Sequence, residues 1–231
     1  MVTERAARAR ADRDLNGWPS GNTLGGPQGK AHVTFDRTQS QYLDAGPRTL
    51  NIATNGGLTI VSVVRFTGTP GFYERIIDLG SGPGAWNIAL CRWSTSNGFN
   101  LALSSIQMTS TQSHYWDAYV EIQNRIEQNT WLTVVVRYSA STRQYVVKVN
   151  NAVDYTGTAS TAVTDRTVSA TYMGRSHWPR DAYFNGDMAG VFVVDEYLST
   201  DATSAIADSM VRGEDLTIQG PCAPQVLWLL S

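Results

Sequence analysis

The stretch Gly57-Leu58-Thr59-Ile60-Val61-Ser62-Val63-Val64-Arg65-Phe66 decides the fold class of this chain. Four apolar side chains share one of its two faces: Leu58, Ile60, Val64 and Phe66. Val61 and Val63 occupy the other face. Because residues two apart in a strand point to the same side, apolar residues on both faces indicate a strand that is buried on both sides. We therefore expect a central strand here.

Similar short runs, rich in β-branched and aromatic residues and separated by turn residues, continue along the chain. The further strand candidates are residues 73–79, 86–93, 99–103, 116–122, 131–138, 145–150, 168–174 and 188–194. One helix is predicted near the end, at 202–211, with capping groups at 199–201 and Gly213 after it. We expect this helix to pack across one end of the sheets. The pattern predicts an all-β, two-sheet antiparallel sandwich with one short C-terminal helix.

The composition is that of a globular protein and excludes several classes of partner. With 231 residues, the chain can form one sizeable domain. We expect an arm and linker at 1–30, the domain at 31–213 and a tail at 214–231. A hydrophobic share of 42% argues against disorder, and a net charge of -2 gives no general attraction to nucleic acid. No apolar run reaches about 18 residues, so we expect no membrane span.

Two features that could reveal the cellular compartment remain open. The first residues lack the apolar core of a secretory signal, so the chain is cytosolic, or has lost its signal, or is part of a longer protein. Cys91 and Cys222 either form one bridge between the tail and the domain or remain two free thiols.

A set of short motifs in a fixed order resembles a known family. The motifs are Val33–Asp36 with Gln41–Asp44, Leu58–Val64, Arg75–Gly80, Trp131–Val136, Tyr145–Asn151, Met173–Arg175, Tyr183–Ala189 and Tyr197–Ser199. Over His32 to Gly213, this order is similar to that of the concanavalin A-like lectin/glucanase superfamily, specifically its laminin-G-like domains. The resemblance implies a jelly roll with more strands than the pattern alone predicts, and it suggests an extracellular or cell-surface location. Asn151 departs from the family's usual glycine.

The carboxylates do not form a pattern typical of a glycosidase. Glycoside hydrolysis needs two carboxyl groups on one cleft, about 5 to 10 Å apart. The chain has no Glu-X-Asp-X-Glu run, and Asp195 and Glu196 are adjacent, so they lie on opposite faces of a strand. The three histidines are isolated in sequence. We therefore expect a non-enzyme, with a divergent glycanase or polysaccharide lyase as the less favoured alternative.

Binding is better supported than catalysis, because aromatic and polar groups gather in the loop at 175–181 and in the segment after it. Sugar rings stack on aromatic side chains, and amide or carboxylate groups bond their hydroxyls. The candidate ligand-binding residues are Trp116, Tyr119, Arg175, His177, Trp178, Asp181, Tyr183 and Asn185. We therefore predict a lectin-like module for a glycan or glycoprotein. The alternative for Trp178 and Tyr183 is that they only cover the end of the sandwich.

Two further hypotheses remain beside glycan binding. The resemblance raises Ca²⁺ as a cofactor, with Asp78, Asp117 or Asp181 as hard oxygen ligands. For Asp78 the simpler alternative is a strand carboxylate that accepts hydrogen bonds from nearby backbone N–H groups. The Ala/Arg-rich N-terminal arm and the apolar C-terminal tail also suggest a structural subunit that docks into a larger assembly.

Overall fold

The computed structural model describes residues 32–85, 87–93, 98–103, 118–122, 125–150, 152–160 and 162–214. For residues 93, 98–103, 118–122, 153 and 154 it describes the backbone path alone. Fourteen strands, the short 3-10 helix η2 (Arg37–Gln39) and one α-helix, α2 (Thr200–Arg212), lie within the described residues. The expected arm and tail, and with them Cys222, lie almost wholly outside these residues.

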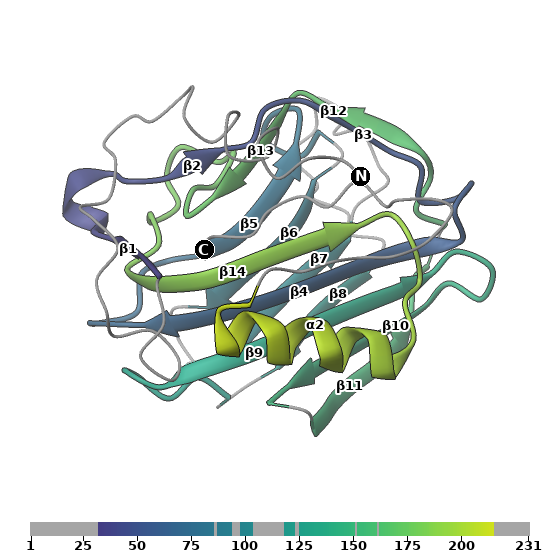
Figure 1. Ribbon diagram of the computed structural model, residues 1–231. Coiled ribbons are helices and arrows are strands. Elements are labelled where there is room, and N and C mark those ends of the chain that lie inside the picture. Colours follow the sequence, from purple (N-terminus) through teal and green to yellow (C-terminus); the bar gives the residue numbers. More distant parts are fainter. Residues whose placement is uncertain are drawn as a thin grey trace.

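Two six-stranded antiparallel sheets pack face to face (Figure 1). The β4 sheet contains, in spatial order, β1 (Val33–Phe35), β14 (Gly186–Val194), β4 (Gly57–Phe66), β9 (Trp131–Ser139), β10 (Gln144–Val149) and β11 (Ala152–Thr158). The β5 sheet contains β2 (Leu43–Asp44), β13 (Ala170–Met173), β5 (Glu74–Gly80), β6 (Ile88–Trp93), β7 (Gly98–Leu103) and β8 (Ala118–Ile122). A short pair, β3 (Arg48–Leu50) with β12 (Arg166–Val168), completes the fold. The predicted jelly-roll sandwich is confirmed.

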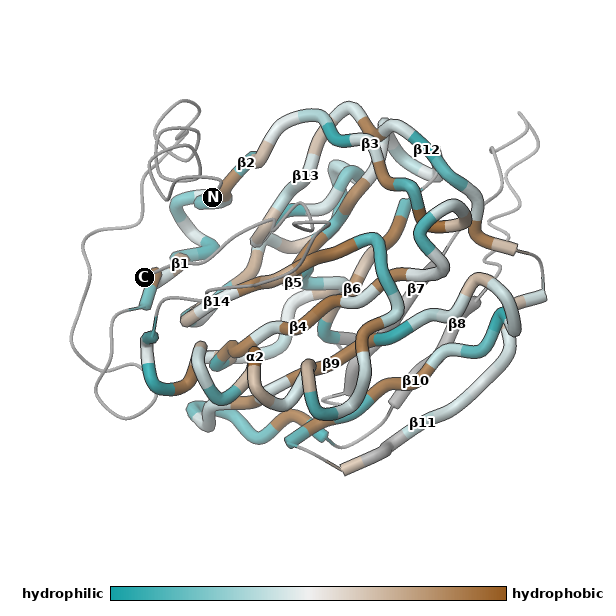
Figure 2. The backbone as a smooth tube through the Cα atoms, turned by 45° about the vertical axis from the view of Figure 1, so that its right-hand side comes forward, coloured by the Kyte–Doolittle hydropathy of each residue, from teal (hydrophilic) through white to brown (hydrophobic). Residues whose placement is uncertain are grey.

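The main core lies between the sheets. From β4, the four residues of the predicted inner face, Leu58, Ile60, Val64 and Phe66, are fully buried in it. Ile77 and Leu79 enter the same core from β5. Figure 2 shows the hydrophobic residues concentrated along the strands of both sheets, with hydrophilic residues mostly at the connections. Because the inner face of each strand packs in this core, only the outer face is available for contacts with other elements or with a ligand.

Helix α2 covers the outer face of the β4 sheet, where it buries the second face of β4 (Figure 1). Val61 and Val63 pack there with Ile206 and Met210 of the helix. The expectation that the helix crosses one end of the sheets was therefore wrong. The reason is visible in β4 itself, since a strand that is apolar on both sides needs a cover for its second face along its length. The predicted caps Ser199 and Gly213 are confirmed, the latter at φ 63°, and the helix itself is slightly longer than the predicted 202–211.

One predicted strand is divided in the structure. Residues 168–174 were expected to form a single strand, but β12 ends at Val168 and β13 begins at Ala170. Because β12 pairs with β3 whereas β13 pairs with β2 and β5, the chain changes partners at Ser169. Apolar periodicity reports burial but not the partner strand, so it could not show this change. No helix of the described residues combines the length and apolar character that crossing a membrane requires.

Candidate functional site

The connection between β13 and β14, residues 174–185, is held in place by two backbone hydrogen bonds. Gly174 has φ +81°, a left-handed conformation that suits glycine, and its carbonyl accepts a hydrogen bond from Phe184 N–H at 2.9 Å. Ala182 N–H donates to the carbonyl of Phe72 at 2.8 Å, which joins the loop to the connection between β4 and β5. This loop contains most of the candidate residues named from the sequence, and it is anchored to two elements.

Below this loop, Asp78 is the centre of a buried polar network. Its neighbours Ile77 and Leu79 point into the core, so Asp78 faces outward from the β5 sheet, yet it is 0% exposed. Asp78 accepts hydrogen bonds from Asn87 Nδ2 at 2.8 Å, from Arg75 Nε at 3.2 Å and from the backbone N–H of His177 at 3.1 Å. The residues of the loop thus cover a carboxylate that would otherwise face solvent.

Asp181 binds the other side of the same guanidinium. Arg75 Nη2 donates to its Oδ2 at 2.9 Å, and Ser176 Oγ donates to the same oxygen at 2.7 Å. Ser176 Oγ in turn accepts from the backbone N–H of Trp178 at 3.1 Å. Arg75 therefore joins a strand carboxylate to a loop carboxylate, and the network fixes the loop on the sheet.

The pKa values of Asp78 and Asp181 are shifted in opposite directions. Burial alone would raise the pKa of Asp78, but the contact with the His177 side chain and the charge of Arg75 outweigh it and lower the pKa overall. For Asp181, burial is the largest effect and raises the pKa, although Arg75 and Ser176 act against it. Asp78 is therefore the more firmly ionised of the pair.

His177 belongs to this buried network rather than to the surface. Its side chain is 5% exposed, and Nδ1 lies 3.0 Å from Asp78 Oδ1. Its ring packs against Tyr172, with the ring centroids 4.5 Å apart. Nε2 is buried and has no hydrogen-bond partner in the described part of the chain. This histidine thus supports the loop and the ring of Tyr172.

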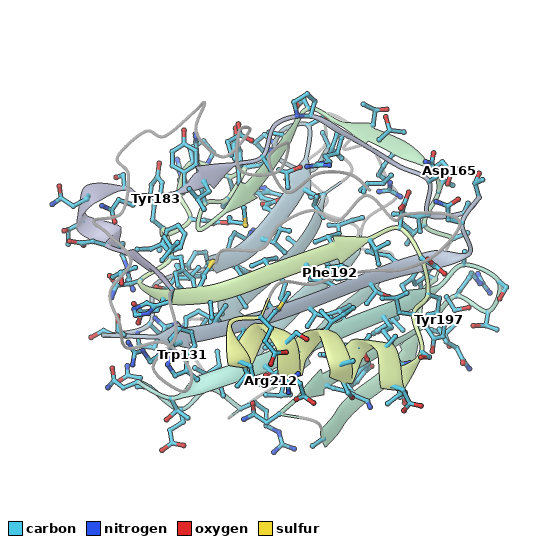
Figure 3. The ribbon with its side chains drawn as sticks, in the orientation of Figure 1. Trp131, Asp165, Tyr183, Phe192, Tyr197 and Arg212 are labelled. Carbon is cyan, nitrogen blue, oxygen red and sulfur yellow. The ribbon has the colours of Figure 1, made fainter. Side chains whose placement is uncertain are left out.

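Next to the network, three tyrosines and an arginine form a half-buried group, which we call the tyrosine cluster: Tyr42, Tyr172, Arg175 and Tyr183. The rings of Tyr42 and Tyr172 meet edge to face at 5.7 Å, and Tyr183 lies 6.2 Å from Tyr42. The guanidinium carbon of Arg175 lies 4.6 Å from the ring centre of Tyr42 and 4.8 Å from that of Tyr172. Figure 3 shows Tyr183 and the exposed Tyr197 at opposite ends of the sandwich. Tyr183 of the cluster thus lies far from Tyr197.

A second aromatic group lies on the other side of the network. The guanidinium of Arg75 lies 5.5 Å from the ring centre of Tyr73 and 5.3 Å from that of Trp178. Phe72 packs on Tyr73 at 4.3 Å and is itself 51% exposed. Tyr73 has φ +53°, which is uncommon for a residue with a side chain. Trp178 is therefore part of an aromatic group at the surface as well as a cover for Arg75.

Three of the predicted residues do not belong to the tyrosine cluster, the buried network or the second aromatic group as the structure describes them: Asn185, Tyr119 and Trp116. Asn185 has a structural role, since its Nδ2 donates to the carbonyl of Thr67 at 3.0 Å and its Oδ1 accepts from Arg37 N–H at 3.2 Å. Tyr119 lies on β8, and Trp116 is outside the described residues.

The strand register nevertheless relates Tyr119 to the loop. It lies opposite Ala102, and this row of paired residues continues through Ala89 to Asp78 and Tyr172. Three strand spacings put its Cα roughly 14 Å from that of Asp78.

Sequence reasoning missed Tyr42 and Tyr172 as members of the site. A signal was present, because Tyr172 precedes the apolar Met173, and alternation in a strand turns such a residue away from the core. Tyr42 precedes Leu43 in the same way. What the sequence could not supply is the pairing of β2 with β13, which brings the two tyrosines together.

The residues proposed for Ca²⁺ do not fit the ion well at this place. Both Asp78 and Asp181 bind the guanidinium of Arg75, which occupies the position between the carboxylates where a cation would be needed. No group of three His, Cys, Asp or Glu side chains suited to a metal occurs among the residues that the structure describes. Asp117 lies outside them.

The family model of the concanavalin A-like lectin/glucanases superfamily matches residues 36–202. The chain belongs to this superfamily. The resemblance found in the sequence motifs is thereby confirmed, and the match extends from η2 to the first turn of α2. A search of curated protein sequences finds no match.

Solved structures of this lectin/glucanase fold are similar at low sequence identity. The CBM40 of the Ruminococcus gnavus IT-sialidase, solved with α2,3-sialyllactose, has 13% identity and a TM-score of 0.55, over 76% of this chain and 95% of that chain. A heptameric SAP-like pentraxin from Limulus polyphemus has 16% identity and a TM-score of 0.50, over 72% and 75%. The extracellular region of zebrafish Gpr126 has 14% identity and a TM-score of 0.51, over 75% and 22%. At such identities the likeness establishes the fold alone.

Proposed function

We propose that the chain is a non-catalytic module that binds a carbohydrate or glycoprotein at the tyrosine cluster and the loop beside it. The observation that carries the proposal is the packing of Tyr42, Tyr172 and Tyr183 into one half-buried group next to an anchored loop. The exposed parts of these phenol rings offer apolar surface to the C–H groups of a sugar ring. Their hydroxyl groups offer donors and acceptors to its hydroxyls.

The contacts among the side chains of the cluster support binding because they lower the entropic cost of ordering these side chains around a ligand. Each ring is held by another ring, by Arg175 or by His177, so few rotamers remain to be frozen when a ligand arrives. The buried network of Asp78 and Asp181 holds the loop in the same way. His177 and Asp181 accordingly contribute to the proposed site by supporting it, whereas Arg175, Trp178 and Tyr183 are proposed to contact the ligand.

The state of the carboxylates supports binding over hydrolysis. A glycosidase needs one carboxyl group as acid and one as base or nucleophile. Asp78 and Asp181 share Arg75, and Asp78 is fully buried, so neither is presented to a substrate as such a pair would be. The similar R. gnavus CBM40, solved with a bound saccharide, gives the proposal further support.

The experiment is a glycan array with the purified chain, followed by calorimetric titration of the best ligand. Tyr172→Ala and Tyr183→Ala should each lower the affinity about tenfold or more, which corresponds to about 1.4 kcal/mol of lost contact. Tyr172→Phe keeps the ring and separates the role of the hydroxyl from that of stacking. Equal affinity of the alanine variants and the unchanged protein would contradict the proposed location.

A matched control comes from the far end of the sandwich. Tyr197 is 40% exposed and also packs against an arginine, Arg137, at 5.2 Å. Tyr197→Ala should therefore leave glycan affinity unchanged. If no glycan binds and the chain elutes as an oligomer whose size depends on residues 1–30 or 214–231, the assembly hypothesis replaces this one.

A further inference from the structure

Two arginines near the loop have similar aromatic neighbours but opposite charge environments. Arg75 lies between Tyr73 and Trp178, is 4% exposed, and binds the carboxylates of both Asp78 and Asp181. Its positive charge is thus compensated within the protein. Arg75 thus serves as a comparison: it is an arginine on this face whose charge is balanced by carboxylates of the protein itself.

Arg175 lacks such compensation. Its guanidinium lies against Tyr42 and Tyr172, and it makes no ion pair or side-chain hydrogen bond with any described residue. Contact with a ring face compensates a cation only in part, by about 0.5 to 2 kcal/mol. Because none of the N–H donors of its guanidinium makes a hydrogen bond to a described residue, these donors remain for the acceptor atoms of a ligand.

Asp44, an acidic residue on β2 opposite Tyr172, does not fill this role. Asp44 pairs with Tyr172 across β2 and β13, but its Oδ1 accepts from the backbone N–H groups of Gly46 at 2.8 Å and Thr171 at 3.3 Å. It makes no ion pair with Arg175. The half-buried cation in the tyrosine cluster is therefore held in place without an anion from the described part of the chain.

We infer that Arg175 is the group that selects acidic saccharides, so that the site prefers sugars with a carboxylate or sulfate over neutral ones. This inference rests on the proposed function. A guanidinium can donate two parallel hydrogen bonds to a carboxylate or sulfate, and such charge-assisted bonds are shorter and stronger than those to a neutral hydroxyl. The rings of Tyr42 and Tyr172 hold the guanidinium beside the surface on which the sugar ring would stack.

The test compares matched saccharides with and without their acidic groups. Uronic-acid oligosaccharides are titrated before and after chemical reduction of their carboxyl groups, and sulfated oligosaccharides before and after desulfation. The full chain should bind at least one acidic form about tenfold or more tightly than its neutral counterpart. The two arms also tell which anion, carboxylate or sulfate, is preferred.

Three variants assign the preference to one residue. Arg175→Gln should remove the preference, so that the acidic and neutral forms bind with similar affinity, and Arg175→Lys should retain part of it, since the charge stays but the paired donors are lost. Arg180 is exposed in the same loop, so Arg180→Gln, which removes the same charge, should leave the preference intact. The NMR signal of the Arg175 Nε–H should shift when the acidic saccharide is added. Thermal melting curves establish that each variant is folded.

The outcomes separate the two proposals. Equal affinity for acidic and neutral forms, or a preference that survives Arg175→Gln, overturns the role of Arg175 and leaves glycan binding intact. If Arg180→Gln loses the preference to the same extent, the preference comes from the net charge of the protein. This result also overturns the inference. Absence of binding to every saccharide overturns both the inference and the proposed function.

Discussion

Glu74 is a carboxylate on β5 that is completely buried, and it lies between two guanidinium groups. It pairs with Arg92, which is also 0% exposed, and with Arg37 on η2. A buried ion pair adds little net stability by itself, but removal of one partner leaves an uncompensated charge in the interior. The pair therefore makes both residues costly to replace singly.

Glu74→Gln should lower the free energy of unfolding by about 3 to 5 kcal/mol. Urea denaturation followed by tryptophan fluorescence measures this change. Glu127→Gln removes the same charge at an exposed position and should alter stability by less than about 0.5 kcal/mol. Similar effects of the two substitutions would contradict the buried ion pair.

The opposite pKa shifts of Asp78 and Asp181 predict opposite pH dependence for their amide variants. Asp78 has a lowered pKa, so the stability it contributes is present above its ordinary value of 3.8 and is lost as the pH falls through the lower folded value. Asp181 has a raised pKa, so its contribution is largest below 3.8 and is lost as the pH rises through the folded value.

At pH 7, Asp78→Asn should cost about 3 kcal/mol or more, because Arg75 loses a buried partner. That cost should shrink below about pH 4, whereas the cost of Asp181→Asn should grow as the pH falls toward 4. Urea denaturation of the three proteins at several pH values between 7 and 3 measures both trends. Parallel trends for the two variants would exclude the assigned network.

At the scale of residues, the sequence predicted which side chains gather in the loop but not what each one does. His177 and Asp181 were expected to contact a ligand, yet each is bound to a residue far away in sequence: Asp78 is 99 positions before His177, and Arg75 is 106 before Asp181. Only the antiparallel register of β5 and β13 shows that the loop lies over Asp78.

Helix α2 gives a test at the scale of elements, because its beginning depends on one side chain. Ser199 accepts a hydrogen bond from Ala202 N–H at 3.1 Å and thereby satisfies a backbone donor of the first turn. Ser199→Ala should destabilise the protein by about 1 kcal/mol in urea denaturation. Ser204→Ala, inside the same helix, is the control and should change stability by less than about 0.5 kcal/mol. An equal loss in both variants would show that the cap has no special role.

Elements with strong local signals were predicted well. The capping residues around α2 and the two apolar faces of β4 each depend on nearby residues, and both are confirmed. The separation of β12 from β13 was not predicted, because it depends on which strand each half pairs with. For the same reason the tyrosine cluster, which depends on β2 lying beside β13, was not predicted.

At the scale of the whole molecule, the reactivity of Cys91 reports how well the outer face of the β5 sheet is covered, since this residue pairs with Arg75 on that face. It is a free thiol on β6 that is 3% exposed, and burial, although opposed by the charge of Arg75, raises its pKa to about 11. A thiol of this kind is unreactive in the native protein, since the thiolate is the nucleophile.

In a Cys222→Ser variant, Cys91 should therefore resist a thiol reagent such as Ellman's reagent at pH 8, and should react fully in concentrated urea. Its labelling rate at intermediate urea should follow the uncovering of the outer face of the β5 sheet. The reaction in urea also serves as the control for thiol content. Rapid and complete labelling of the folded protein would contradict the burial of Cys91.

The fold class of the whole molecule was the easiest property to predict from the sequence. Alternating apolar runs occur along most of the chain, and few segments have a helical pattern. Two packed sheets follow from these runs because each strand must bury an apolar face. The order of strands within each sheet was out of reach, because it depends on which strands pair. The choice of ligand depends on still smaller features, such as whether the guanidinium of Arg175 has a carboxylate of the protein beside it.

The position of α2 has a practical consequence for measuring the proposed interaction. The helix covers the outer face of the β4 sheet, while the tyrosine cluster and its loop belong to the outer side of the β5 sheet. Ala205 and Asp208 are exposed on that helix. A biotin attached to a cysteine at either position would immobilise the protein on a sensor chip with the cluster directed into the flowing solution.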